Sequence, residues 1–165
     1  LANPARATHQ LLGVSDLDRV EPVARVLLEL GTRRALVVHG GGGVDELSLE
    51  GENVALLVEA GKRPSSVTVE PESLGLKRAP VSALRGGDAA ENAGILRRVF
   101  SGEPGPARDA VVLNAAAALW VAERASDLSA GVRLASQGLD DGGAGRTLDA
   151  FIAATRRNAD EGSAS

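Results

Sequence analysis

Two adjacent carboxylates, Asp45 and Glu46, are the residues whose types and spacing best suit metal chemistry. They follow a short apolar run at 36–38, typical of a buried strand, and the four glycines 40–43. Glycines permit positive φ and let a ligand approach the backbone closely. Paired acids beyond the carboxyl end of a strand suit Mg²⁺, which takes a few carboxylates and leaves positions for substrate phosphates. The alternative is a solvated turn in which Asp45 caps the next segment.

The other polar candidates favour structural explanations. The glycines 40–43 could present N–H groups to an anion, but the lysine and hydroxyl of the usual nucleotide-binding loop are absent from the sequence here. Residues 85–93 (Arg-Gly-Gly-Asp-Ala-Ala-Glu-Asn-Ala) contain a capping-box pattern at a helix start. Asn114 interrupts an apolar run, and because an unbonded buried amide costs about 1–3 kcal/mol, we expect it to bond the backbone of a loop. We expect packing or hydrogen-bonding roles for His9 and His39, and we assign no catalytic residue and no residue that binds an organic cofactor.

The predicted elements that position these residues are alternating strands and helices in the first part of the chain and helices in the second part. Strand 9–14, helix 20–31 and strand 35–39 form a strand–helix–strand unit, which implies a parallel sheet. Strands at 53–59 and 66–70 predict an antiparallel hairpin on the sheet edge, followed by one helical turn at 72–74. Helices are predicted at 88–102, 107–125, 128–139 and 147–158. We therefore predict an α/β fold with a mixed, mostly parallel sheet flanked by helices, one domain over 1–158 and a disordered tail at 159–165.

Composition excludes several classes of protein. The chain of 165 residues carries a net charge of -4 and has three aromatic residues, Phe100, Trp120 and Phe151, which argues against a nucleic-acid partner. It has no cysteine, so thiolate metal sites and thiol nucleophiles are excluded, and this fits a reducing cytoplasm. The longest apolar run, residues 110–122, falls short of the ~20 residues that span a bilayer.

Five segments occur together in a specific order and spacing: residues 1–6 (Leu-Ala-Asn-Pro-Ala-Arg), 8–14 (Thr-His-Gln-Leu-Leu-Gly-Val), 37–48 with the acidic pair, 85–93, and 113–119 (Leu-Asn-Ala-Ala-Ala-Ala-Leu). Together they resemble the second half of an anthranilate phosphoribosyltransferase, from residue 1 to about residue 151. No single segment is specific, but the combination is.

The resemblance implies a pentosyl-type glycosyltransferase of tryptophan biosynthesis. Such an enzyme transfers a phosphoribosyl group from phosphoribosyl pyrophosphate to the amino group of anthranilate. The resemblance further implies that Asp45 and Glu46 bind the Mg²⁺ that contacts the pyrophosphate. Residues 1–158 would then be the C-terminal part of a catalytic domain of the nucleoside phosphorylase and phosphoribosyltransferase type. The complete enzyme would be a cytoplasmic homodimer.

The family's Gly-Pro-Leu-x-Asn-Pro motif is matched here only by residues 1–4. We therefore expect the chain to lack the helical domain, the glycine-rich pyrophosphate loop and the arginine that orients anthranilate, and to be inactive when isolated. Two alternatives stay open: a related transferase of the pyrimidine nucleoside phosphorylase type, and a non-catalytic fragment that only assembles with its complementary half.

Overall fold

The structure is a computed structural model that describes residues 7–162, with side chains up to residue 157. The segment 1–6, which contributed to the resemblance, lies outside the described residues.

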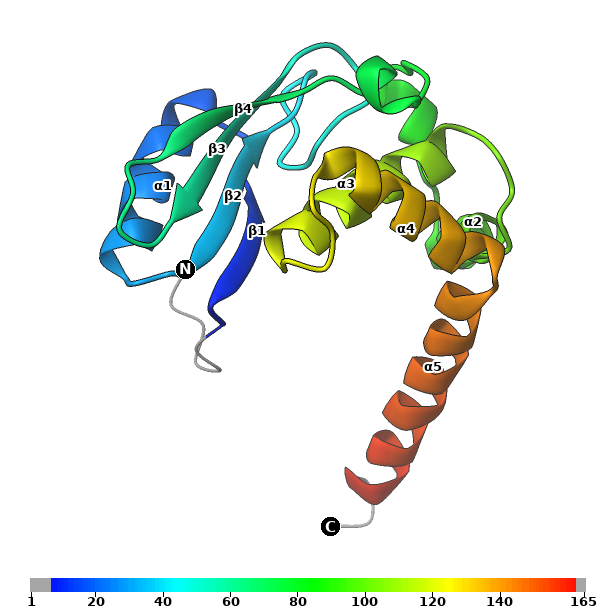
Figure 1. Cartoon of the computed structure of the whole chain (residues 1–165). Coiled ribbons are helices and arrows are strands. Elements are labelled where there is room, and N and C mark those ends of the chain that lie inside the picture. Colours follow the sequence, from blue (N-terminus) through cyan, green and yellow to red (C-terminus); the bar gives the residue numbers. More distant parts are fainter. Residues whose placement is uncertain (1–6, 163–165) are drawn as a thin grey trace.

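A strand–helix–strand unit begins the described part of the chain (Figure 1). Its elements are β1 (His9–Gly13), the short 3-10 helix η1 (Leu17–Arg19), α1 (Val20–Glu29) and β2 (Arg34–His39). The two strands pair in parallel, as the sequence predicted. The helical segment begins after Asp16, whose side chain accepts a hydrogen bond from the N–H of Asp18 at 3.0 Å.

The strand pairs beyond β2 are antiparallel. Strand β3 (Asn53–Glu59) pairs with β2, and β4 (Ser65–Val69) pairs with β3, so the described sheet has the order β1-β2-β3-β4. The hairpin on the sheet edge is confirmed, as is the mixed sheet. The expected majority of parallel pairs is wrong for the described strands, because one pair is parallel and two are antiparallel. The physical reason is the connection 40–52, which has no crossover helix to carry the chain back for a parallel strand.

The remainder of the chain is helical, as predicted. Its elements are η2 (Glu72–Leu74), η3 (Val81–Leu84), α2 (Ala89–Phe100), α3 (Pro106–Val121), α4 (Leu128–Asp140) and α5 (Gly143–Gly162). Helix α5 is longer at both ends than the predicted helix 147–158, and it extends into the stretch 159–165 that was predicted to be a disordered tail. Residues 163–165 lie outside the described residues.

Helix α1 covers one face of the sheet. Its buried positions Val20, Ala24 and Leu27 recur at helical spacing and pack against Val37 and Val58 of the sheet. This small aliphatic cluster is separate from the core on the other face.

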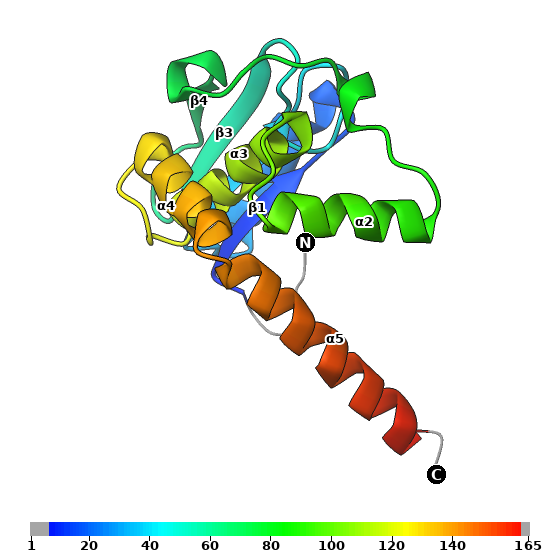
Figure 2. The ribbon, with the colours of Figure 1, turned by 90° about the vertical axis from the view of Figure 1, so that its right-hand side faces the viewer.

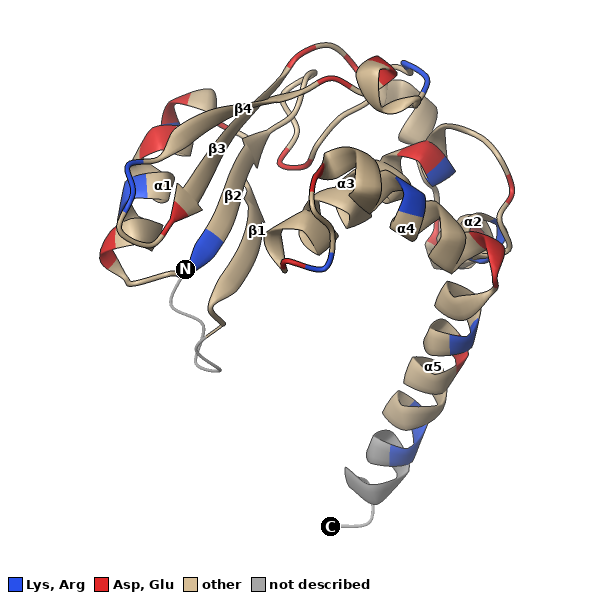
Figure 3. Cartoon of the chain, in the orientation of Figure 1, with Lys and Arg blue, Asp and Glu red and all other residues tan. Residues whose placement is uncertain are grey.

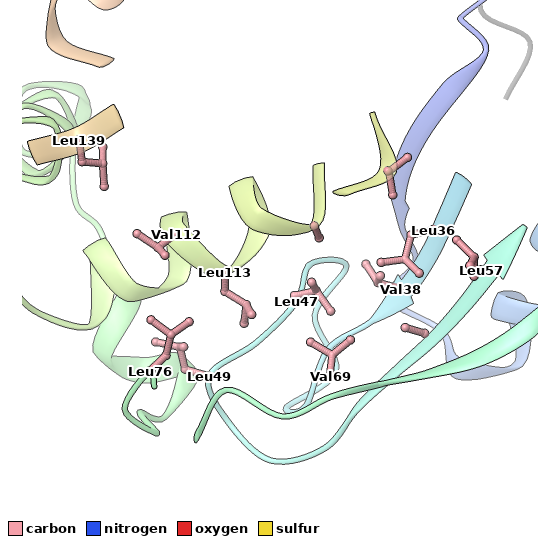
Figure 4. Close-up of a cluster of buried hydrophobic side chains, with 13 residues drawn as sticks. Leu36, Val38, Leu47, Leu49, Leu57, Val69, Leu76, Val112, Leu113 and Leu139 are labelled. Carbon is pink, nitrogen blue, oxygen red and sulfur yellow. The ribbon is translucent and has the colours of Figure 1, made fainter. Parts of the chain in front are cut away.

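Helix α3 covers the opposite face, above β1 and β2. Its Leu113 belongs to a cluster that includes Leu36 of β2, and the loop residues Leu47 and Leu49 complete the same cluster (Figure 4). The loop that carries the acidic pair is therefore anchored in the main core directly after the acids.

Helix α5 projects away from the sheet and the other helices in both views (Figures 1 and 2). Near its start it is tied to α2 by an ion pair between Arg97 and Asp149, whose atoms lie 3.3 Å apart. Among the described residues, no helix is both long and apolar enough to cross a membrane.

Candidate functional site

The acidic pair lies in the loop 40–52, at the carboxyl end of β2 and beside α3. Figure 3 shows acidic residues, in red, on the loop between β2 and β3. The loop begins with a tight turn in which the N–H of Gly40 donates to the carbonyl of Val44 at 2.9 Å and the N–H of Gly43 donates to the carbonyl of Gly40 at 3.1 Å. Gly42 and Gly43 have φ of 83° and 80°, a conformation that favours glycine. Because two of the glycine N–H groups are used inside the turn, the four glycines do not form a continuous anion cradle.

Asp45 and Glu46 leave this turn with exposed side chains and closely packed backbones. A Cβ added to Gly13, at the end of β1, would lie 1.5 Å from the carbonyl oxygen of Asp45. A Cβ added to Gly40, just after β2, would lie 2.1 Å from the carbonyl oxygen of Glu46. Glycine is therefore required at both strand ends so that the acidic backbone can sit against the sheet.

The residue after the acids is held by α3. The side-chain amide of Asn114 accepts a hydrogen bond from the N–H of Leu47 at 2.9 Å and donates one to the carbonyl of Leu47 at 2.8 Å. We call this arrangement, in which one asparagine amide bonds both backbone groups of a single residue, an amide clamp. The predicted role of Asn114 as a loop anchor is confirmed, although the side chain is half-buried rather than fully buried.

A second amide clamp holds the next residue. Asn53, at the start of β3, accepts from the N–H of Ser48 at 2.7 Å and donates to its carbonyl at 3.0 Å. The Ser48 hydroxyl in turn accepts from the N–H of Glu50 at 2.9 Å. Both clamped residues are buried, with 2% of Leu47 and 3% of Ser48 exposed. The segment that follows the acids is therefore fixed through its backbone from α3 and from the sheet.

The two carboxylates suit a hard cation. Among the described side chains, neither Asp45 nor Glu46 has a hydrogen bond or ion pair that would occupy its oxygens, and no cluster of three or more potential metal ligands forms. Oxygen-only ligands, few in number and open to solvent, match Mg²⁺, which keeps water or substrate phosphates in its other positions. The residues therefore fit a magnesium site that substrate would complete.

The two histidines lie apart from one another. The His39 side chain hydrogen-bonds through Nδ1 to the carbonyl of Val14 at 2.9 Å, which ties the ends of β1 and β2 together. His9 lies at the opposite end of β1, where its Nε2 is 3.1 Å from Glu123, a carboxylate that also accepts from Arg33 at 2.8 Å. The hydrogen bond from His9, and then the Arg33 charge, hold the pKa of Glu123 below its ordinary value of 4.5. Both histidines have the hydrogen-bonding roles that we expected.

The motif 85–93 also has its structural role. The Asp88 side chain accepts from the N–H of Glu91 at 2.9 Å and so caps α2. Asn92 forms a third amide clamp, on Gly87, with both bonds at 3.0 Å. The side-chain hydrogen bonds of Asp88 and Asn92 stay within the motif, so they stabilise the helix start locally.

Some contributors to the acidic site were missed by sequence reasoning. Gly13 and Ser48 lie in segments that carry the resemblance, but neither they nor Asn53 were singled out for this site, because their contacts with the loop depend on the folded arrangement. The one available signal was the change from an apolar run to glycine at 13, which marks the end of a strand.

The chain is similar to known proteins over most of its length. Residues 1–145 match the glycosyl transferase family, a/b domain. The chain is 50% identical over 157 residues to the anthranilate phosphoribosyltransferase of Chloroflexus aurantiacus, covering 94% of this chain and 46% of the relative. The enzyme of Chloroflexus aggregans is 49% identical over 160 residues, covering 96% of this chain and 47% of that relative. The chain therefore spans about half the length of the curated relatives that it matches.

The chain is also similar to solved structures of anthranilate phosphoribosyltransferases. The crystal structure of anthranilate phosphoribosyltransferase from Thermus thermophilus is 44% identical, with a TM-score of 0.76 over 86% of this chain and 41% of that chain. The Saccharomyces cerevisiae enzyme in complex with PRPP and Mg is 24% identical, with a TM-score of 0.77 over 87% of this chain and 42% of that chain, a likeness that shows the fold.

Proposed function

Because the chain belongs to the glycosyl transferase family through its a/b domain, we propose that it supplies the metal-binding part of an anthranilate phosphoribosyltransferase. The reaction breaks the bond between the anomeric carbon of phosphoribosyl pyrophosphate and its pyrophosphate, and forms a bond from that carbon to the amino nitrogen of anthranilate. The observation that carries the proposal is the pair Asp45 and Glu46, exposed on a rigidly held backbone in a chain about half identical to such enzymes.

Asp45 and Glu46 would hold Mg²⁺ at the carboxyl ends of β1 and β2. When bound, the ion supplies positive charge beside the departing pyrophosphate, where negative charge develops. The part of this chain is to hold the backbone of both acids in place, which limits the positions that their carboxylates can take. Positioning matters because the acceptor is a weakly basic aromatic amine.

Among the described residues, we assign two metal ligands and no site for anthranilate. We therefore propose that a further part of the protein completes the active site. Residues outside the 165 would grip the pyrophosphate and orient anthranilate, and the isolated chain would not turn over. The complete enzyme would be a homodimer, as the resemblance implies, and light scattering measures this directly.

The test joins this chain to the N-terminal part of the C. aurantiacus relative. The folded chimera and the isolated chain are assayed for pyrophosphate release with phosphoribosyl pyrophosphate, anthranilate and Mg²⁺. We expect steady turnover by the chimera and none by the isolated chain. A folded chimera that releases no pyrophosphate would contradict the proposed reaction, and turnover by the isolated chain would contradict the assignment of acceptor contacts to other residues.

A further inference from the structure

The acidic pair is followed by backbone that has no strand partner. Leu47 and Ser48 are buried, so their N–H and C=O groups need partners other than water. Side-chain amides from Asn114 and Asn53 take the place of a neighbouring strand at these residues. The position of this backbone is therefore determined by asparagine side chains and not by a sheet ladder.

The side chains of the two acids do not anchor the loop. Among described residues, the side chains of Asp45 and Glu46 bond nothing that would fix the loop. On one side, Gly13 and Gly40 restrict the movement of their backbone. It packs so closely against these glycines that neither position has room for a Cβ. On the other side it is limited by the amide clamp of Asn114, which begins one residue after Glu46.

Asn114 is itself held in place. Its Nδ2 also donates to the carbonyl of Ala110, one turn earlier in α3, at 3.0 Å. The neighbouring Leu113 is fully buried against the sheet. The clamp therefore transmits the position of a rigid helix to the loop.

We propose that Asn114 is a positioning residue for the metal pair Asp45 and Glu46, with Asn53 supporting it from β3. This inference rests on the proposed magnesium role of the pair. Two carboxylates that share one cation repel each other when the cation is absent, so they separate unless the backbone holds them together. Removing the clamp permits that separation. Groups that bond metal ligands directly typically contribute 10–100-fold in metal affinity, and we expect the lower end of that range for a clamp that acts through the backbone of Leu47.

The test is a titration of the 165-residue chain with Mn²⁺ as a paramagnetic probe. The dissociation constant is measured from the broadening of the backbone amide signals of residues 45–47. We expect Asn114→Ala to raise this constant about tenfold or more. If that variant does not fold, Asn114→Ser replaces it, because the shorter hydroxyl does not reach both groups of Leu47.

Two matched controls separate positioning from a general loss of structure. Asn92→Ala removes the same kind of amide clamp from Gly87, at the start of α2. Val58→Ala destabilises the core on the α1 side without touching a clamp. We expect both controls to bind Mn²⁺ within about twofold of the wild type.

Equal affinity in Asn114→Ala and the wild type would overturn the positioning role, and so would a control weakened as much as Asn114→Ala. Absence of broadening at residues 45–47 in the wild type would instead contradict the proposed metal pair.

Discussion

At the residue scale, the proposed function depends on two exposed side chains and on several residues that hold the backbone beneath them. Asp45 and Glu46 are exposed, whereas the glycines and asparagines around them make close or buried contacts. This division suits a cation site, because a backbone held in advance reduces the freedom that the two acids lose when an ion binds.

A different acidic residue, Glu123, links folding to pH. Its pKa is lowered by the hydrogen bond from His9 and by the charge of Arg33, so the folded state favours the ionised carboxylate. The stability that it contributes is present above the ordinary pKa of 4.5 and is lost as the pH falls through the lowered value. We expect the wild type to lose more stability than Glu123→Gln between about pH 6 and about pH 3. Urea unfolding at several pH values measures this difference, and parallel curves for the two proteins would contradict it.

The acids could be predicted from sequence, but their surroundings could not. Asp45 and Glu46 follow an apolar run and a glycine turn, which is a local pattern. The contact of Asn114 with Leu47 spans 67 residues, and the contact of Gly13 with Asp45 depends on two strand ends meeting. The sequence indicated that the Asn114 amide needs a hydrogen-bond partner. Only the structure identifies that partner as the backbone of Leu47.

At the element scale, local signals located the helices and strands well. The cap at Asp88 and the hairpin of β3 and β4 both follow residue preferences that act over a few positions. The predicted majority of parallel pairs was wrong, because β3 pairs antiparallel with β2 and this direction depends on the connection 40–52. Helix α5 exceeds its predicted length because Gly143 and Gly145 lower helix propensity without preventing a helix.

The packing of α3 against α4 offers a prediction at this scale. A Cβ added to Gly131 in α4 would lie 2.5 Å from the carbonyl oxygen of Ala116 in α3, so the helices would have to separate. We expect Gly131→Ala to lower the free energy of unfolding by about 1–3 kcal/mol, measured by urea denaturation.

Gly138→Ala in the same helix is the control. Nothing lies within 4 Å of a Cβ at that position, so we expect it to be neutral or to stabilise the helix by up to about 1 kcal/mol. If the two variants have the same stability, the close approach of α3 and α4 is not what requires glycine at 131.

At the scale of the whole molecule, the acidic loop joins the two layers. The sheet contacts it through Gly13, Gly40 and Asn53, and the helical layer contacts it through Asn114. Leu47 and Leu49 place the same loop in the main core (Figure 4). We therefore expect the proposed metal site to need both the sheet and α3 in their packed positions.

The central claim is that Asp45 and Glu46 hold the Mg²⁺ of phosphoribosyl transfer. Its most direct test is the Mg²⁺-dependent turnover of the chimera with Asp45→Asn and Glu46→Gln, beside a control in which Glu29→Gln and Glu70→Gln remove the same charge elsewhere. Because the acids are exposed, we expect circular dichroism to show a folded double variant. We predict that its turnover falls by about 100-fold or more while the control keeps the activity of the wild type. Full activity in the Asp45 and Glu46 double variant would contradict the claim.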